Sequence, residues 1–233
     1  MTRRRALVAI LLVALSLTAG GATVLAAAHG GGPPAERVER AVAAMEALRG
    51  VRFTFEATSR ASGEAPVGGE LVTTVRGNGE LAPPDRLHLA VEVAGMSHDI
   101  VLSGDRAWVD GRRVARGSVG PLGRPLAALE AIRGAGTIRA LGLGWAGGVT
   151  ARFQIALGPT DLLDRLGPGA GVAAGSSGVI EVHLGLFDDR IRAHSFRVLQ
   201  AAEGADTGLD RVETSYRLDY AAWDVPVTIR EPE

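Results

Sequence analysis

The stretch 51–58, VRFTFEAT, decides the fold class, because apolar and polar residues alternate along its whole length. Successive side chains of a β-strand point to opposite faces, so this alternation predicts a strand with one buried and one solvated face. The apolar positions are Val51, Phe53, Phe55 and Ala57.

The segment directly before it has a different period. Between residues 35 and 49, Val38, Val42, Met45 and Leu48 recur at helical spacing, which predicts an amphipathic helix. Gly50 is expected to end this helix as a C-cap.

The chain after residue 58 returns repeatedly to the two-residue period. Further strands are expected at 71–76, 87–93, 98–102, 107–109, 149–157, 179–186, 191–199, 212–220 and 225–229. Pro226 suggests that the last of these lies at a sheet edge. Two short helices are expected at 126–133 and 161–166, and the Gly-rich stretch 134–148 has no clear pattern.

The order of these elements predicts an α+β protein. Strands follow one another through short turns, so the sheet should be antiparallel. The strands do not alternate with crossover helices, which argues against a doubly wound fold. A few helices cannot cover both faces of so large a sheet. We therefore expect a curled antiparallel sheet, a half-barrel, wrapped around a few helices.

The N-terminus predicts export. Arg3, Arg4 and Arg5 precede an apolar stretch, and Ala26 and Ala28 form an A-x-A cleavage pattern. Residues 1–28 are therefore either a cleaved signal peptide or an uncleaved signal anchor, because 6–28 carries no charge and is long enough to cross a bilayer. Residues 29–34 are expected to be a Gly/Pro linker and 35–233 the folded domain. Both alternatives place that domain in the periplasm or cell envelope.

Composition excludes several functional classes. The net charge of −1 gives no reason to propose nucleic-acid binding. With no Cys and no Lys, thiolate chemistry, Cys-based metal sites and Schiff-base lysines are excluded. The histidines lack the spacing of a metal site, and no nucleophile–base arrangement is recognisable. We expect no enzyme activity, cofactor or metal.

Four segments together resemble a known group. They are 43–55 (AAMEALRGVRFTF), 84–89 (PDRLHL), 180–196 with FDD at its turn, and 218–232 (LDYAAWDVPVTIREP). With the leading export signal, they resemble the LolA-like lipoprotein-carrier superfamily, and more narrowly the mycobacterial-type LppX/LprA/LprF/LprG lipid-binding family. The resemblance implies a half-barrel whose apolar cavity holds acyl chains of lipids or glycolipids. That family is usually lipidated on a Cys after the signal, and this chain has none.

The resemblance and the apolar strand faces together suggest which residues would line such a cavity. The alternative for each is ordinary core packing. The expected partners are lipid or glycolipid acyl chains and a membrane surface or envelope transport partner. A second interpretation is an envelope-anchored interaction or sensor domain of the same fold that binds another protein. The candidate lining residues are Phe53, Phe55, Leu89, Val91, Leu102, Leu126, Leu129, Ile132, Phe153, Ile155, Val182 and Phe196.

Overall fold

The computed structural model describes residues 32–62, 71–83, 85–116, 119, 137–159, 176–201 and 211–232. Within them one α-helix, α2 (Pro34–Glu46), precedes a series of strands. The strands are β1 (Val51–Ser62), β2 (Leu71–Ala82), β3 (Arg86–Val93), β4 (Met96–Ser103), β5 (Arg106–Val109), β6 (Arg112–Val114), β7 (Ile138–Trp145), β8 (Val149–Leu157), β9 (Ser177–Gly185), β10 (Ile191–Ala201) and β11 (Arg211–Trp223).

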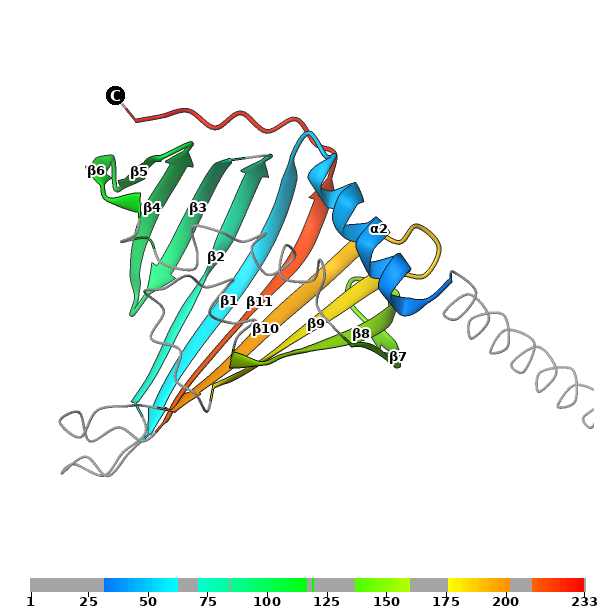
Figure 1. The fold of residues 1–233 in the computed structure, drawn as a ribbon. Helices are drawn as coiled ribbons and strands as arrows, with labels where there is room; N and C mark the ends of the chain where they lie inside the picture. The colour runs from blue at the N-terminus through cyan, green and yellow to red at the C-terminus, as the bar shows by residue number, and fades with distance from the viewer. Residues whose placement is uncertain are drawn as a thin grey trace, which may run out of the picture.

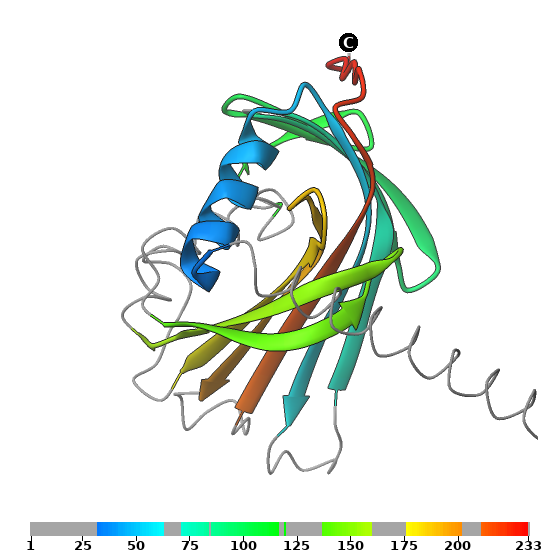
Figure 2. The same ribbon diagram turned by 90° about the vertical axis from the view of Figure 1, so that its right-hand side faces the viewer.

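All these strands belong to one antiparallel sheet of 11 strands in the order β6-β5-β4-β3-β2-β1-β11-β10-β9-β8-β7. The first and last strands, β1 and β11, pair at its centre, so the two halves of the chain form the two halves of the sheet. The sheet is open at β6 and β7 and curls strongly, with α2 lying along its concave side (Figure 1; Figure 2). The predicted α+β fold class with a curled antiparallel sheet is confirmed.

The period of two sorts the side chains of the sheet between two environments. The alternating residues of β1 from Val51 to Glu56 are buried and exposed in turn. The register places Phe55 beside Leu218 of β11 and beside Gly77 of β2, so apolar positions of neighbouring strands share the concave face. This face, which we call the inner wall, is where the hydrophobic core lies.

Helix α2 closes one end of the inner wall. It begins with Pro34 in its first turn, where the missing N–H costs nothing, and Glu36 in the same turn suits the helix dipole. Its buried side includes Val38, Ala41, Val42 and Met45, three of which the helical spacing predicted.

The predicted C-cap at Gly50 is wrong, because α2 ends at Glu46 and Ala47 occupies the cap. Gly50 instead allows the backbone of Val225 to lie close to it, because a Cβ at position 50 would collide with the Val225 carbonyl oxygen. Val225 donates its N–H to the Gly50 carbonyl oxygen at 3.2 Å.

The predicted strand at 225–229 is also wrong, because these residues follow β11 without joining the sheet ladder. Pro226 has no N–H to extend the pairing that Val225 begins. Ile229 packs instead with Val101 and Trp108 in a small cluster of their own. By contrast, β7 arises in the Gly-rich stretch that showed no clear period in the sequence.

Several predictions fall outside the described residues. These are the export signal at 1–28, residues 29–31 of the linker predicted at 29–34, and the helices at 126–133 and 161–166. In the part of the chain that the structure describes, no helix is both long and apolar enough to span a membrane.

Candidate functional site: the inner wall of the sheet

The inner wall collects most of the candidate lining residues in one place. Nine of them are buried and belong to a single hydrophobic cluster contributed by both halves of the sheet. These nine are Phe53, Phe55, Leu89, Val91, Leu102, Phe153, Ile155, Val182 and Phe196. Leu126, Leu129 and Ile132 lie outside the described residues. Whether the nine contact a ligand stays a prediction, since the same placement also makes a packed core.

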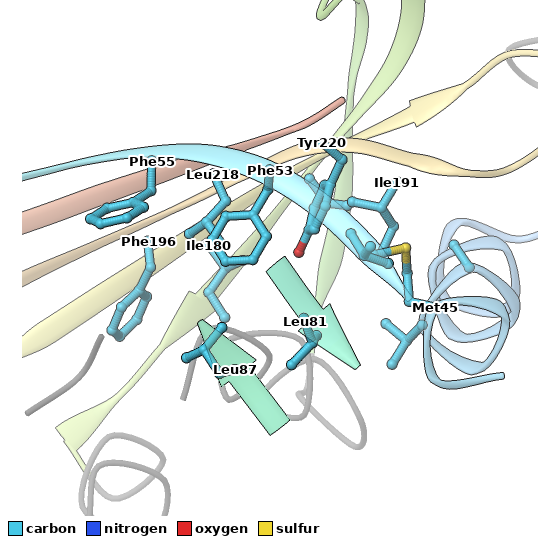
Figure 3. Packing of buried hydrophobic residues seen from close by; sticks show 14 of the residues in the cluster. Met45, Phe53, Phe55, Leu81, Leu87, Ile180, Ile191, Phe196, Leu218 and Tyr220 are labelled. Atoms are coloured by element: carbon cyan, nitrogen blue, oxygen red, sulfur yellow. The ribbon is translucent and has the colours of Figure 1, made fainter. Parts of the chain in front are cut away.

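Aromatic side chains from three adjacent strands form the centre of the wall (Figure 3). The ring of Phe53 lies 6.1 Å from that of Tyr220 in an edge arrangement and 6.4 Å from that of Phe55. The rings of Phe196 and Tyr216 are 5.4 Å apart, also edge to face. Such geometry is favourable for aromatic pairs and leaves large apolar surfaces directed inward.

The sequence-based site omitted Tyr216, Leu218 and Tyr220 of β11, although all three share the inner wall with Phe53 and Phe55. A signal was present, because these residues alternate at period two in the predicted strand 212–220. Their position beside β1 at the centre of the sheet follows only from the pairing of the first and last strands.

The centre of the wall also contains buried polar groups. The Tyr220 hydroxyl and His194 Nδ1 lie 3.1 Å apart, and His194 is completely buried. Burial raises the pKa of both Tyr216 and Tyr220 well above the usual value of tyrosine. Both hydroxyls are therefore protonated at neutral pH, and the centre of the wall carries no phenolate.

A buried charge stands at the α2 end of the wall. Arg37 is 2% exposed, and its Nη2 lies 2.6 Å from Oδ1 of Asp189 in the β9–β10 turn. Its guanidinium also stands 5.6 Å from the centre of the Phe153 ring. Arg40, one helical turn later, reaches the other oxygen of Asp189 at 3.2 Å. These contacts attach α2 to the sheet and fix how that end is closed.

The opposite end of the wall is more open. On β1 the inward residues change from buried at Phe55 to half-buried at Ala57, Ser59 and Ala61. Their neighbours Val75 on β2 and Tyr216 on β11 are likewise half-buried, and Leu71 at the start of β2 is 69% exposed. An apolar chain could therefore reach the wall most directly from this end.

The outer face of the sheet has a different character. A groove with a volume of about 850 Å³ is lined mainly by outward-pointing polar residues. The register aligns Glu92, Arg76, Glu56 and Arg217 in a row of alternating charge across it. Glu56 and Arg76 form an ion pair at 3.0 Å, and Arg217 pairs with Asp219 of its own strand at 2.7 Å. The groove is thus on the side away from the apolar residues, and the apolar cavity expected from the resemblance stays a prediction.

A second polar cluster lies on the outer surface of β8 and β9. His183 is nearly buried, with Nε2 2.9 Å from Oε1 of Glu181 and Nδ1 3.1 Å from the Thr150 hydroxyl. Burial lowers the pKa of His183, whereas the hydrogen bond from Arg152 lowers the pKa of Glu181. Among the described residues, no three His, Asp or Glu side chains are grouped so that they could hold a metal ion.

Comparison with known proteins gives structural similarity only. No protein-family model matches the chain, and no curated protein is similar to it in sequence. The solved structure of LprF from Mycobacterium bovis is similar with a TM-score of 0.48 and 10% identity, covering 85% of this chain and 96% of that one.

Two further solved structures are similar at lower scores. A putative outer membrane lipoprotein-sorting protein domain from Vibrio parahaemolyticus has a TM-score of 0.30 and 12% identity, over 83% of this chain and 95% of the other. The LolA superfamily protein NE2245 from Nitrosomonas europaea has a TM-score of 0.29 and 11% identity, over 83% and 93%.

Proposed function

We propose that this chain is an exported, non-catalytic lipid-binding protein that holds acyl chains against the inner wall and moves lipids or glycolipids across the cell envelope. The observation that carries the proposal is the inner wall itself: apolar residues contributed by both halves of one open, curled sheet, closed by α2 at one end and half-exposed at the other.

The chemistry of the wall suits an acyl chain. Such a chain requires apolar contact and no specific polar partner, and each buried CH₂ contributes about 0.8 kcal/mol. The aromatic residues around Phe53 offer broad apolar surfaces, and the tyrosines among them are protonated at neutral pH. The resemblance of residues 43–55 and 218–232 to lipid-binding carriers points to the same class of ligand.

The test is native mass spectrometry with organic extraction of the chain purified from a bacterial host. Co-purification of phospholipid or glycolipid at near one molecule per protein supports the proposal and identifies the ligand class. An apo mass, with no uptake of added lipid, contradicts it.

A pair of variants on β1 tests where the lipid lies. Ala57→Trp places a bulky ring on the half-exposed end of the inner wall and is expected to lower the lipid content. Thr58→Trp, one residue on, points to the outer face and is the matched control, with lipid content unchanged. Equal lipid content in the two variants would exclude this end of the wall as the lipid site.

The second candidate function is an envelope-anchored interaction or sensor domain that binds another protein. The groove of about 850 Å³ on the outer face favours it, because charged side chains such as Arg76 and Arg217 line it and can pair with groups of a protein segment but not with an acyl chain. This function would be supported if the purified protein contained no lipid and the Arg76→Glu variant lost binding to a protein partner. The Arg60→Glu variant, changed outside the groove, is the control and should keep that binding.

A further inference from the structure

The ends of β7, β8 and β9 next to α2 expose several large apolar side chains. Phe187 is 86% exposed, Trp145 72%, Val149 46% and Leu143 38%. Thr150 pairs with Gly144 on β7 and with Gly185 on β9, so the turn after β7 and the turn after β9 lie at the same end of three adjacent strands. We call these four residues the apolar corner.

The chain enters the folded domain beside this corner. Arg37, in the first turn of α2, donates its backbone N–H to the Pro33 carbonyl oxygen, and its side chain donates a hydrogen bond to Asp189. Asp189 belongs to the same β9–β10 turn as Phe187. Figure 1 shows the start of α2 beside that turn and the β7–β8 end of the sheet. Whatever precedes Gly32 is therefore connected to the domain at this end.

The sequence before α2 places an uncharged stretch only a few residues from the folded domain. Residues 6–28 carry no charge, and only residues 29–33 separate them from the first residue of α2. Five residues span at most about 17 Å when fully extended. If residues 6–28 remain in a bilayer, the start of α2 and the turn bonded to it are held near the bilayer surface.

From these placements we infer that the apolar corner docks on the surface of the lipid bilayer, with Trp145 and Phe187 at the level of the headgroups. Trp is enriched at membrane interfaces, because its ring is apolar while its indole N–H needs a polar partner, and exposed Phe gains free energy by leaving water. The inference rests on residues 6–28 staying attached, and it is independent of acyl-chain binding at the inner wall.

The test uses the full chain, purified from membranes and reconstituted into phosphatidylethanolamine–phosphatidylglycerol vesicles. Because the natural chain has no Cys, single cysteines at Phe187→Cys and Leu71→Cys can each carry one environment-sensitive fluorophore. Leu71 is the matched control: it is apolar, 69% exposed and at the far end of β2, since Leu81 rather than Leu71 pairs with Val51 beside α2. Brominated acyl chains in the vesicles serve as the quencher.

We expect brominated lipid to remove roughly half or more of the emission at position 187 and to leave position 71 unchanged, as for a residue at headgroup depth. Intrinsic fluorescence gives a label-free check: the emission lost in the Trp145→Phe variant should be the part that brominated lipid quenches. Equal quenching at 187 and 71, or none at 187, overturns the inference. So does an intact mass showing that the membrane-extracted chain begins after Ala28. Lipid extraction of the same samples reports on the inner wall separately, so either proposal can fail alone.

Discussion

The ring of Phe53 on β1 lies directly against Gly79 of β2, its partner in the strand register. A Cβ at Gly79 would collide with the ring carbons of Phe53, and a Cβ at Gly77 would collide with the Ala90 carbonyl oxygen and come too close to the ring of Phe55. Two glycines of one strand thus make room for two aromatic rings of the next. This arrangement lets both rings lie close to the backbone of β2 at the centre of the inner wall.

The first prediction concerns this contact. Gly79→Ala should lower the free energy of unfolding by about 1–3 kcal/mol, because the Phe53 ring must leave a well-packed position. Equilibrium unfolding in urea measures the change. Gly148→Ala is the control, since a Cβ there meets nothing within 4 Å, and it should change stability by less than about 0.5 kcal/mol. Equal effects of the two substitutions would show that the ring does not occupy this position.

The second prediction concerns the two tyrosines. Tyr216 and Tyr220 are the protein's only tyrosines, and burial raises the pKa of both above the ordinary value of 10.0. The folded protein should show no phenolate absorbance as the pH passes 10, whereas the urea-unfolded chain should titrate two tyrosines there.

The sign of the accompanying stability change follows from proton binding. Above about pH 10 the unfolded chain loses tyrosine protons that the folded chain keeps, so the free energy of unfolding should fall as the pH rises. Below that pH the contribution is fully present. A normal tyrosine titration in the folded protein would mean that the hydroxyls reach solvent and that the wall is more open than described.

The third prediction concerns the attachment of α2. Asp189→Asn keeps a side chain that tolerates the positive φ of 47° at this position but removes the charge that Arg37 contacts. Because Arg37 is buried, the free energy of unfolding should fall by about 2 kcal/mol. Arg40→Ala removes a half-exposed partner of the same carboxylate and should cost less than about 1 kcal/mol. A smaller effect for Asp189→Asn than for Arg40→Ala would argue against a buried Arg37 pair.

The fourth prediction concerns acid sensitivity at His183. Burial lowers its pKa below the ordinary 6.5, although Glu181 acts in the opposite direction. The unfolded chain therefore binds a proton more readily, and the stability contributed by neutral His183 is present above about pH 6.5 and lost as the pH falls through the folded pKa. Urea unfolding at neutral and mildly acid pH should show a smaller pH dependence for His183→Gln than for the natural protein. Equal pH dependence in the two proteins would contradict this prediction.

Local periodicity was sufficient to predict most of the strands, α2 and the side of each strand that is buried. The alternation Val51-Phe53-Phe55 assigns each side chain to the buried or the solvated face, because every second side chain of a strand points to the same face. Where local signals compete, prediction failed. Gly50 is a residue type typical of a helix C-cap, but here it allows the backbone of Val225 to come close. Residues 225–229 have the alternating pattern of a strand, but Pro226 lacks the N–H needed to continue the pairing.

The sequence by itself thus determined the antiparallel, half-buried character of this protein and which apolar residues could face inward. Only the tertiary structure decided that β1 and β11 pair at the centre of the sheet, that Tyr220 therefore meets Phe53, and that Phe187 and Trp145 share one end with the start of α2. The reason is physical: periodicity is encoded in neighbouring residues, whereas strand order depends on contacts between residues far apart in the chain, which no local pattern records.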